Sequence, residues 1–160
     1  MRAWPTTSSS KQVLLLNELE EVLETAGAEA TAPVLGPLLD LLARCVGSSH
    51  FQVAERALFL WHNETLGRGV LGRAYTQNVL PVLFEPLHRQ ASEHWNVTVE
   101  SLATSVMKLY SEADPALYER CTAALAAKQR EGNVAAEAEA ARRAKWAALE
   151  AAAEKLPPPQ

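Results

Sequence analysis

The sequence predicts an all-α protein, a short α-solenoid in which pairs of helices stack into an α-α superhelix. Apolar residues recur at the three- and four-residue spacing of amphipathic helices along most of the chain. No stretch shows the sustained alternation of a half-buried strand. The chain also repeats itself at an interval of 44 to 45 residues. Two-helix solenoid repeats have a similar length, about 40–47 residues.

The internal repeat consists of two similar helix pairs. At an offset of 45 residues, five positions of the first helix carry identical residues in the two copies: Val34, Leu35, Leu38, Leu42 and Arg44, then Val79, Leu80, Leu83, Leu87 and Arg89. The turn into the second helix recurs at an offset of 44 residues: Ser48, His50, Phe51 and Val53, then Ser92, His94, Trp95 and Val97. We therefore predict two full repeats, at about 33–75 and 76–113, with flanking helices inside a repeat region at 11–126.

Three helices are expected in the first half of the chain, after a flexible lead-in at 1–10. Each has one apolar stripe, and they span Lys11 to Thr25, Pro33 to Val46, and Phe51 to Asn63. Gly27 is expected to end the first helix. Pro33 suits the first turn of the second, where a backbone amide would have no partner. The glycine-rich stretch at 64–75 is expected to form a short helix and a loop.

Two of these helices have a possible capping box at their start. Ser9 with Gln12, and Ser49 with Gln52, have the three-residue spacing that such a cap requires. The first helix also carries four glutamates away from its apolar stripe: Glu18, Glu20, Glu21 and Glu24. Such a charged side is usually a solvated helix surface, and a partner-binding site is the alternative.

The second half of the chain repeats the pattern. A helix begins near Thr76, and Pro86 is expected to kink or shorten it. Asn96 can cap the next helix, which has the most regular apolar stripe in the sequence. Asp114 followed by Pro115 indicates the N-cap and the first residue of another helix.

The tail at 127–160 is rich in Ala, Glu, Arg and Lys and ends in a run of prolines. This composition favours a helix but leaves few large side chains to bury. Gly132 and Asn133 are expected to break the helix, and Trp146 and Leu149 are its only late anchors. Trp146 has two interpretations: it packs within the chain, or it docks in a groove of a partner.

Composition and motifs argue against several classes of function. The net charge of −4 gives no reason to expect nucleic acid as a partner, and no run approaches the roughly 18 apolar residues of a membrane span. Cys45 and Cys121 lack metal-ligand spacing, which favours reduced thiols in an intracellular protein. No nucleotide-binding, hydrolase or metalloprotease motif is present. We therefore expect no cofactor, no metal and no enzyme active site.

Four residues are candidates for contact with a partner protein: His50, His94, Arg56 and Trp146. His50 and His94 occupy equivalent positions of the repeat, so a shared structural role at the corner between two helices is the simpler interpretation. Most of the other aromatic residues lie on or beside apolar stripes and are expected in the core: Phe51, Trp61, Phe84, Trp95, Tyr110 and Tyr118.

Several blocks of the sequence are similar to one known family. They read KQVLLLNELEEVL at 11–23, ARCVGSSHFQVAERAL at 43–58, LPVLF at 80–84, HWNVTV at 94–99 and LYERCT at 117–122, with Lys145-Trp146 in the tail. In these blocks the chain resembles the B-prime regulatory subunits of protein phosphatase 2A. The similarity extends in order over nearly the whole chain, and it departs from the family mainly at 25–32, at 67–74 and in the tail.

This resemblance implies a HEAT- or armadillo-like solenoid that is the C-terminal part of a longer protein, with an extended terminal helix. Such a subunit is not an enzyme. It binds the scaffold and catalytic subunits of the phosphatase, modulates phosphatase activity in signal transduction and meets phosphoprotein substrates indirectly, in the cytoplasm and the nucleus. The family's groove for short substrate motifs lies in the middle repeats, so the resemblance transfers no substrate-pocket residue to this sequence.

A second function is also possible: a truncated family member that acts as a general protein-interaction solenoid without assembling the holoenzyme. With either function, the first helix should expose apolar side chains that a preceding repeat would cover.

Overall fold

The computed structural model describes residues 4–153, and within them every regular element is a helix. The α-helices are α1 (Ser9–Thr31), α2 (Leu35–Val46), α3 (Phe51–Phe59), α4 (Glu64–Arg68), α5 (Thr76–Glu93), α6 (Val97–Ala113) and α7 (Pro115–Ala153). Short 3-10 segments join them: η1 (Ala32–Val34), η2 (Leu60–His62) and η3 (Arg73–Tyr75). The predicted all-α fold is confirmed for the described residues.

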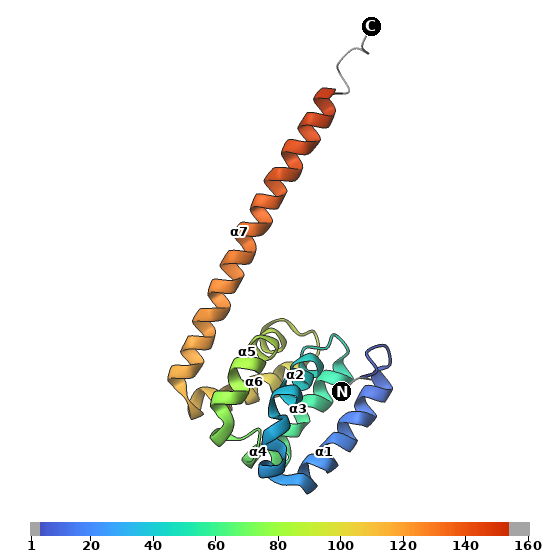
Figure 1. The fold of residues 1–160 in the computed structure, drawn as a ribbon, viewed down its shortest axis with the longest axis vertical. Helices are drawn as coiled ribbons and strands as arrows, with labels where there is room; N and C mark the ends of the chain where they lie inside the picture. Colours follow the sequence, from blue (N-terminus) through green and yellow to red (C-terminus); the bar gives the residue numbers. More distant parts are fainter. Residues whose placement is uncertain (1–3, 154–160) are drawn as a thin grey trace. The chain divides into compact units, whose positions relative to one another are not determined.

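The chain divides into two units, Met1–Cys121 and Thr122–Gln160. The first unit contains α1 to α6 and the first turns of α7, and the second contains the remainder of α7. Figure 1 shows α1 to α6 gathered in one group of helices.

Within the first unit, the long helices lie in two layers. α2 packs against α5 in one layer, while α3 packs against both α1 and α6 in the other (Figure 1). Contacts between the layers pair α2 with α3 and α5 with α6. Pairs of helices stacked in this way form an α-solenoid, and α1 takes the place of the second helix of a preceding pair.

Leucines at equivalent repeat positions form the centre of the core. Leu38 and Leu42 of α2, and Leu83 and Leu87 of α5, are each at most 1% exposed. They lie on one side of their helices because the spacing of four residues nearly matches the helical period. The sequence repeats at these positions because each leucine fills the same kind of space between neighbouring helices.

One side of α1 lacks a packing partner within the described residues. Leu16 and Leu23 are buried, whereas Leu14 and Val22 are 62% and 61% exposed. The expected exposure of apolar side chains on the first helix is therefore confirmed.

A buried hydrogen-bond chain joins the connection between α3 and α5 to α6. The indole Nε1 of Trp61 donates to the Tyr110 hydroxyl at 2.7 Å, and that hydroxyl donates to the carbonyl oxygen of Leu71 at 2.7 Å. Tyr110 is fully buried and Trp61 is 8% exposed. Both polar groups are thus satisfied without water, which fixes the irregular segment between η2 and η3 to the core.

Two predicted N-caps are confirmed. The Asn96 side chain accepts the backbone N–H groups of Thr98 and Val99 at the start of α6, at 3.0 and 3.3 Å. Asp114 accepts the N–H of Leu117 at 2.9 Å, directly before Pro115 begins α7. These side chains satisfy amides that have no partner inside the helix.

Both predicted capping boxes are wrong. The N-caps of α1 and α3 are Ser8 and His50, and neither makes a side-chain capping hydrogen bond. Gln12 instead accepts the indole N–H of Trp4 at 3.2 Å, and the Ser48 hydroxyl accepts the N–H of His50 at 3.1 Å. Each N-cap lies one residue away from the predicted one, at Ser8 and at His50, so the three-residue spacing no longer matches the helix start.

Of three expected breaks, one is present and two are not. Gly27 has non-helical geometry at φ 72° and ψ 175°, so the range Ser9–Thr31 contains two helical stretches that meet at a kink there, as expected. α5 continues past Pro86 to Glu93, because its apolar side is packed against α2 and α6 and this packing offsets the lost backbone bond. α7 continues through Gly132, since a single glycine costs about 1 kcal/mol relative to alanine in a helix otherwise built from strong helix formers.

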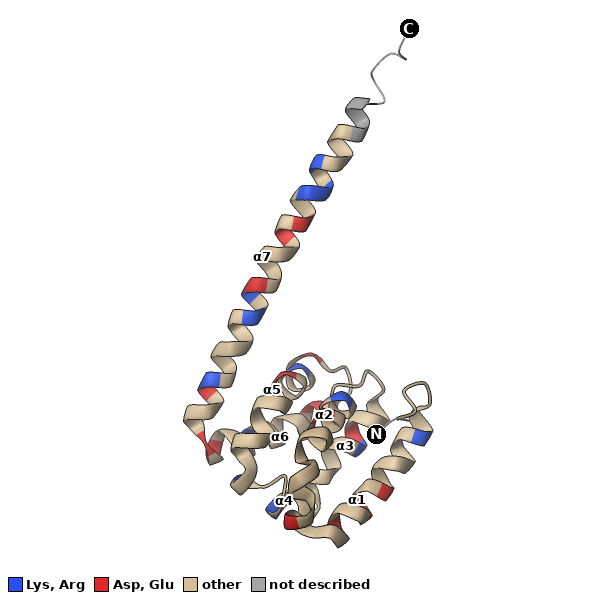
Figure 2. Cartoon of the chain, viewed as in Figure 1, with Lys and Arg blue, Asp and Glu red and all other residues tan. Residues whose placement is uncertain are grey.

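The second unit is a helix without a buried side among its described side chains. Trp146 and Leu149, expected as anchors, are 68% and 58% exposed, and Val134 is 66% exposed. Figure 2 shows acidic and basic residues interspersed along α7, and Glu139 pairs with Arg143 one turn later. Among the described helices, none combines the length and apolar character that crossing a membrane would require.

Trp61→Ala should lower the free energy of unfolding by about 3–5 kcal/mol, because it empties a buried aromatic site. Chemical denaturation followed by circular dichroism measures this loss. Trp146→Ala is the matched control, and its change should stay within about 0.5 kcal/mol because the side chain is exposed. Equal stability of the two variants would show that Trp61 is not part of the core.

Tyr110→Phe should cost about 1–3 kcal/mol, because it keeps the ring and leaves the indole N–H of Trp61 and the Leu71 carbonyl without a partner. The loss is measured by denaturation as for Trp61→Ala. Tyr75→Phe alters a part-buried tyrosine outside this hydrogen-bond chain and serves as the control. A loss no larger than that of the control would contradict the role given to the Tyr110 hydroxyl.

Candidate partner-binding surface

The structure separates the four predicted partner-binding residues. His50 and His94 lie at the turns that precede α3 and α6, and Arg56 lies within α3. Trp146 belongs to the second unit. Only the two histidines are therefore at equivalent places in the fold, as the repeat predicts.

Arg56 is engaged within the chain, where it links α3 to α1. Its guanidinium forms an ion pair with Glu20 and also donates to the side chain of Asn17. Asn63, which caps α4, donates to the same Glu20 carboxylate at 2.8 Å and to Glu24. These contacts give part of the acidic side of α1 a structural role, and they leave Arg56 only 19% exposed.

The pKa of the Glu20 carboxyl reflects this network. Burial alone would raise the pKa, since it disfavours the charged form. Hydrogen bonds from Arg56 and Asn63 and the positive charge of Arg56 outweigh burial, so the pKa is lowered below its ordinary value of 4.5. The charged form of Glu20 therefore stabilises the contact between α1 and α3.

The turn between α2 and α3 is held by the end of α5. Gln90 is 4% exposed and donates to the carbonyl oxygens of Val46 and Ser48, at 2.6 and 3.2 Å. Arg89 donates to the carbonyl oxygen of Gly47 at 2.8 Å. Three successive carbonyl groups of the turn therefore have partners, and the two repeats are joined at this corner.

His94 is oriented by the turn before α6. Its Nδ1 accepts the backbone N–H of Asn96 at 3.0 Å. In a neutral imidazole one nitrogen accepts and the other carries the proton, so this contact assigns the proton to Nε2. Nε2 is buried and has no hydrogen-bond partner within the described residues.

The rings of the two repeat turns form a continuous row. His50 stacks on Phe51 with ring centroids 5.9 Å apart, and Phe51 meets the edge of Trp95 at 5.6 Å. Trp95 stacks on His94 at 5.6 Å. We call His50, Phe51, Trp95 and His94 the aromatic row. Trp95 was expected in the core but is 71% exposed, because it lies in the turn before α6 and not on the buried side of that helix.

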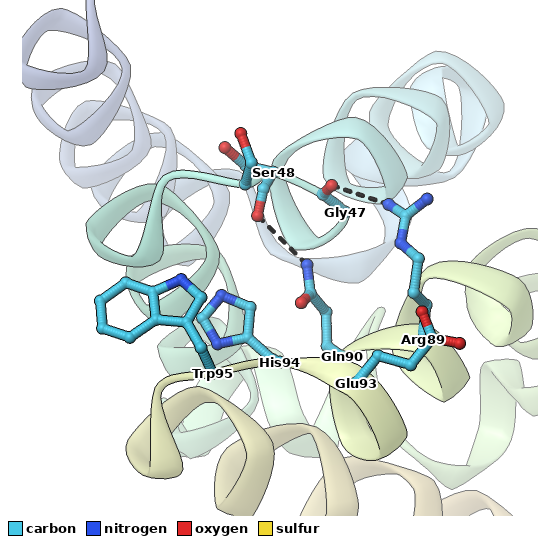
Figure 3. A pocket seen from close by; sticks show the side chains of 8 residues that line it. Gly47, Ser48, Arg89, Gln90, Glu93, His94 and Trp95 are labelled. Carbon is cyan, nitrogen blue, oxygen red and sulfur yellow. Dashed lines mark hydrogen bonds between the residues drawn. The ribbon is translucent and has the colours of Figure 1, made fainter.

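A pocket of about 430 Å³ opens beside the aromatic row (Figure 3). Its lining residues are Gly47, Ser48, Ser49, Arg89, Gln90, Glu93, His94 and Trp95. The lining combines exposed aromatic surface with hydrogen-bonding groups, which suits recognition of a peptide or a polar group. Within the described part of the chain, no group of three or more His, Cys, Asp or Glu side chains could hold a metal ion.

Sequence reasoning did not single out Arg89, Gln90 or Glu93 as members of a site. A signal for Gln90 is nevertheless present, because it follows Val79, Leu83 and Leu87 on the apolar stripe of α5 at helical spacing. A polar residue on a buried stripe needs partners, and the carbonyl groups of the neighbouring turn provide them.

Comparison with known proteins identifies a family for the whole described chain. The family described as "Protein phosphatase 2A regulatory B subunit (B56 family)" matches residues 1–153. The chain belongs to the B56 family. Members of this family are regulatory and not catalytic subunits, in agreement with the expectation from the sequence.

Individual B56 proteins are similar over most of this chain. It is 43% identical over 150 residues to the B' eta isoform of the 59 kDa regulatory subunit of serine/threonine protein phosphatase 2A from Arabidopsis thaliana, covering 94% of the chain and 28% of that protein. It is 40% identical over 132 residues to the delta isoform of the 56 kDa regulatory subunit from Homo sapiens, covering 82% of the chain and 22% of that protein. The chain thus spans less than a third of the length of these curated relatives.

Glu20→Gln should destabilise the first unit at neutral pH by about 0.5–1 kcal/mol, the usual size for a partly exposed ion pair. A lowered pKa in the folded state means that this stability is present above the ordinary carboxyl pKa and is lost as the pH falls through the folded value. The difference between wild type and Glu20→Gln should therefore shrink in acid.

Urea denaturation between about pH 7 and pH 3 measures this difference. Glu21→Gln is the control, because Glu21 is an exposed neighbour on the same helix. A difference between wild type and Glu20→Gln that stays constant with pH would show that the Glu20 carboxylate does not stabilise the fold.

Proposed function

We propose that this chain is a non-catalytic regulatory segment of protein phosphatase 2A that binds the scaffold and catalytic subunits and modulates phosphatase activity in signal transduction. Membership of the B56 family supports this proposal. Phosphoprotein substrates would be met indirectly, through the assembled phosphatase. We place this activity in the cytoplasm and the nucleus, the compartments that the family resemblance implies.

The observation that carries the choice of surface is the aromatic row. Interface contacts are enriched in tryptophan and other aromatic side chains, whereas a monomer rarely leaves a tryptophan beside further apolar surface without a use. Trp95 is 71% exposed and Val97, two residues on, is 74% exposed. We therefore assign partner contact to His50, His94 and Trp95, at the turns before α3 and α6.

The other two predicted contact residues are assigned separately. Arg56 supports the interface only by holding α1 to α3, since Glu20 and Asn17 occupy its guanidinium. Trp146 remains a proposed second contact on α7, where its exposed ring suits a groove of a partner.

Trp95→Ala should weaken retention of the scaffold and catalytic subunits by about tenfold or more, the scale of an aromatic hot spot. A quantitative pull-down of purified phosphatase subunits with the full chain measures the effect, with circular dichroism to confirm the fold. Phe59→Ala is the matched control, because Phe59 is also an exposed aromatic residue but lies outside the aromatic row.

Two results would contradict the proposal. If the wild-type chain retains neither subunit, it does not assemble with the phosphatase, and the general interaction solenoid is the better description. If Trp95→Ala binds as well as wild type while the wild-type chain assembles, the interface lies elsewhere on the chain.

A further inference from the structure

We infer that the distal part of α7 pairs in antiparallel orientation with the same segment of a second copy of this chain. The segment runs from Val134 to Leu149 and belongs to the second unit. This inference goes beyond the proposed function, because it names the partner of the exposed Trp146 ring as another molecule of the same protein.

The first argument is apolar surface without a partner on one side of α7. Val134, Trp146 and Leu149 are 66%, 68% and 58% exposed. At about 100° per residue, their side chains leave the helix within an arc of about 120°, with Leu149 at its centre. A helix that carries its large apolar side chains on one side normally covers that side with another element. This arc is therefore the side of α7 that a second helix would cover.

The second argument is the order of charges along the same segment. An acidic block is followed after two residues by a basic block: Glu137 and Glu139, then Arg142, Arg143 and Lys145. Figure 2 shows the two blocks as a red group followed by a blue group along α7. Two parallel helices in register would place each block against the same charge. Two antiparallel helices place each acidic block against the basic block of the other copy, which is the complementary arrangement.

Both arguments select one register. An antiparallel pair centred midway between Glu139 and Arg142 makes each of these residues face the other on the second copy. The same register sets Val134 opposite the stretch between Trp146 and Leu149, where the larger apolar side chains lie. Glu139 and Arg142 project on or next to the apolar arc. Charge pairing and apolar packing are thus satisfied together, which selects a second copy of this segment as the occupant.

The strength of the contact follows from its size and its competitors. Glu139 pairs with Arg143 within the helix, where the two side chains are 50% and 78% exposed, and an exposed pair of this kind contributes little. Either side chain can therefore turn to a second helix at small cost. A helix pair of about sixteen residues is about 24 Å long and smaller than the standard interface of about 1,200 Å². We therefore expect association at micromolar concentration and not an obligate dimer.

Charge reversal tests the pairing. Sedimentation equilibrium of the full chain, from about 1 to about 500 μM, should show a monomer and dimer in exchange for wild type. One variant, Glu137→Arg with Glu139→Arg, makes both blocks basic. The other makes both blocks acidic: Arg142→Glu with Arg143→Glu and Lys145→Glu. Each alone should self-associate at least about tenfold more weakly, whereas an equimolar mixture should form a heterodimer.

Two further variants locate the contact. Glu18→Arg with Glu21→Arg is the matched control, because it reverses two exposed charges on α1 and should leave self-association unchanged. Trp146→Ala should weaken self-association by about fivefold or more, since it removes the largest exposed ring of the segment. Circular dichroism of each variant checks that α7 stays helical.

Spin labels report the orientation of the pair. In a chain with Cys45→Ala and Cys121→Ala, a label is placed at Ala141→Cys or at Ala127→Cys, and pulsed electron paramagnetic resonance measures the distance between the two copies. In an antiparallel pair the labels at 141 lie close to the centre, within about 20 Å of each other. The labels at 127 are separated by about 27 residues along the pair, or about 40 Å. A parallel pair gives a short distance at both positions.

Several results would overturn the inference. They are a wild-type chain that stays monomeric throughout the concentration range, a helical charge-reversed variant that associates as wild type does, a mixture of two helical variants that does not pair, and a short distance between labels at 127. Loss of association in the α1 control would place the contact on α1 and would contradict the inference as well. No phosphatase subunit is present in these experiments, so their outcome is independent of the pull-down.

Discussion

The Tyr110 hydroxyl is the contact on which the order of the first unit most depends. It accepts from Trp61 and donates to the Leu71 carbonyl, so one buried oxygen joins three segments that are distant in sequence. The connection between α3 and α5 contains several glycines and only short helical pieces, and it has little regular structure to stabilise itself. Fixing that connection to α6 joins the two helix pairs just beyond the end of α3 and near the end of α6.

The candidate site lies at the other ends of these helices, at the turns before α3 and α6. The aromatic row contains one histidine and one larger ring from each repeat turn, and neither turn alone brings these rings together. Gln90 and Arg89 then hold the first turn against the end of α5 through its carbonyl groups. The surface is therefore a property of two adjacent repeats.

Much of the fold follows from periodicity in the sequence. Leu38, Leu42, Leu83 and Leu87 repeat at a fixed offset and are all buried, because stacked helix pairs place equivalent positions in equivalent surroundings. Asn96 and Asp114 act as caps as expected, since a side chain two or three residues from its target needs no tertiary information. The repeat of apolar residues and the identity of the capping residues were therefore sufficient to predict the buried leucines and the two N-caps.

The candidate site was less accessible to sequence reasoning. The repeat paired Trp95 with Phe51, which suggested equal burial, yet Phe51 begins α3 whereas Trp95 lies before α6 begins. Such a shift of helix start depends on packing and capping together, and the spacing of apolar residues does not report it. Arg56 was similarly ambiguous, because only the fold brings Glu20 from α1 to meet it.

The exposed part of α7 continues without a break from the first turns of the helix, and this continuity explains why it stays helical. Starting a helix is the costly step, and adding residues to an existing one is close to neutral for alanine-rich sequence. The first turns of α7 are ordered by the Asp114 cap and by the contact of Tyr118 with Phe84, at 5.3 Å between ring centroids. These turns act as a template from which the remainder of α7 propagates, although its described side chains bury no core.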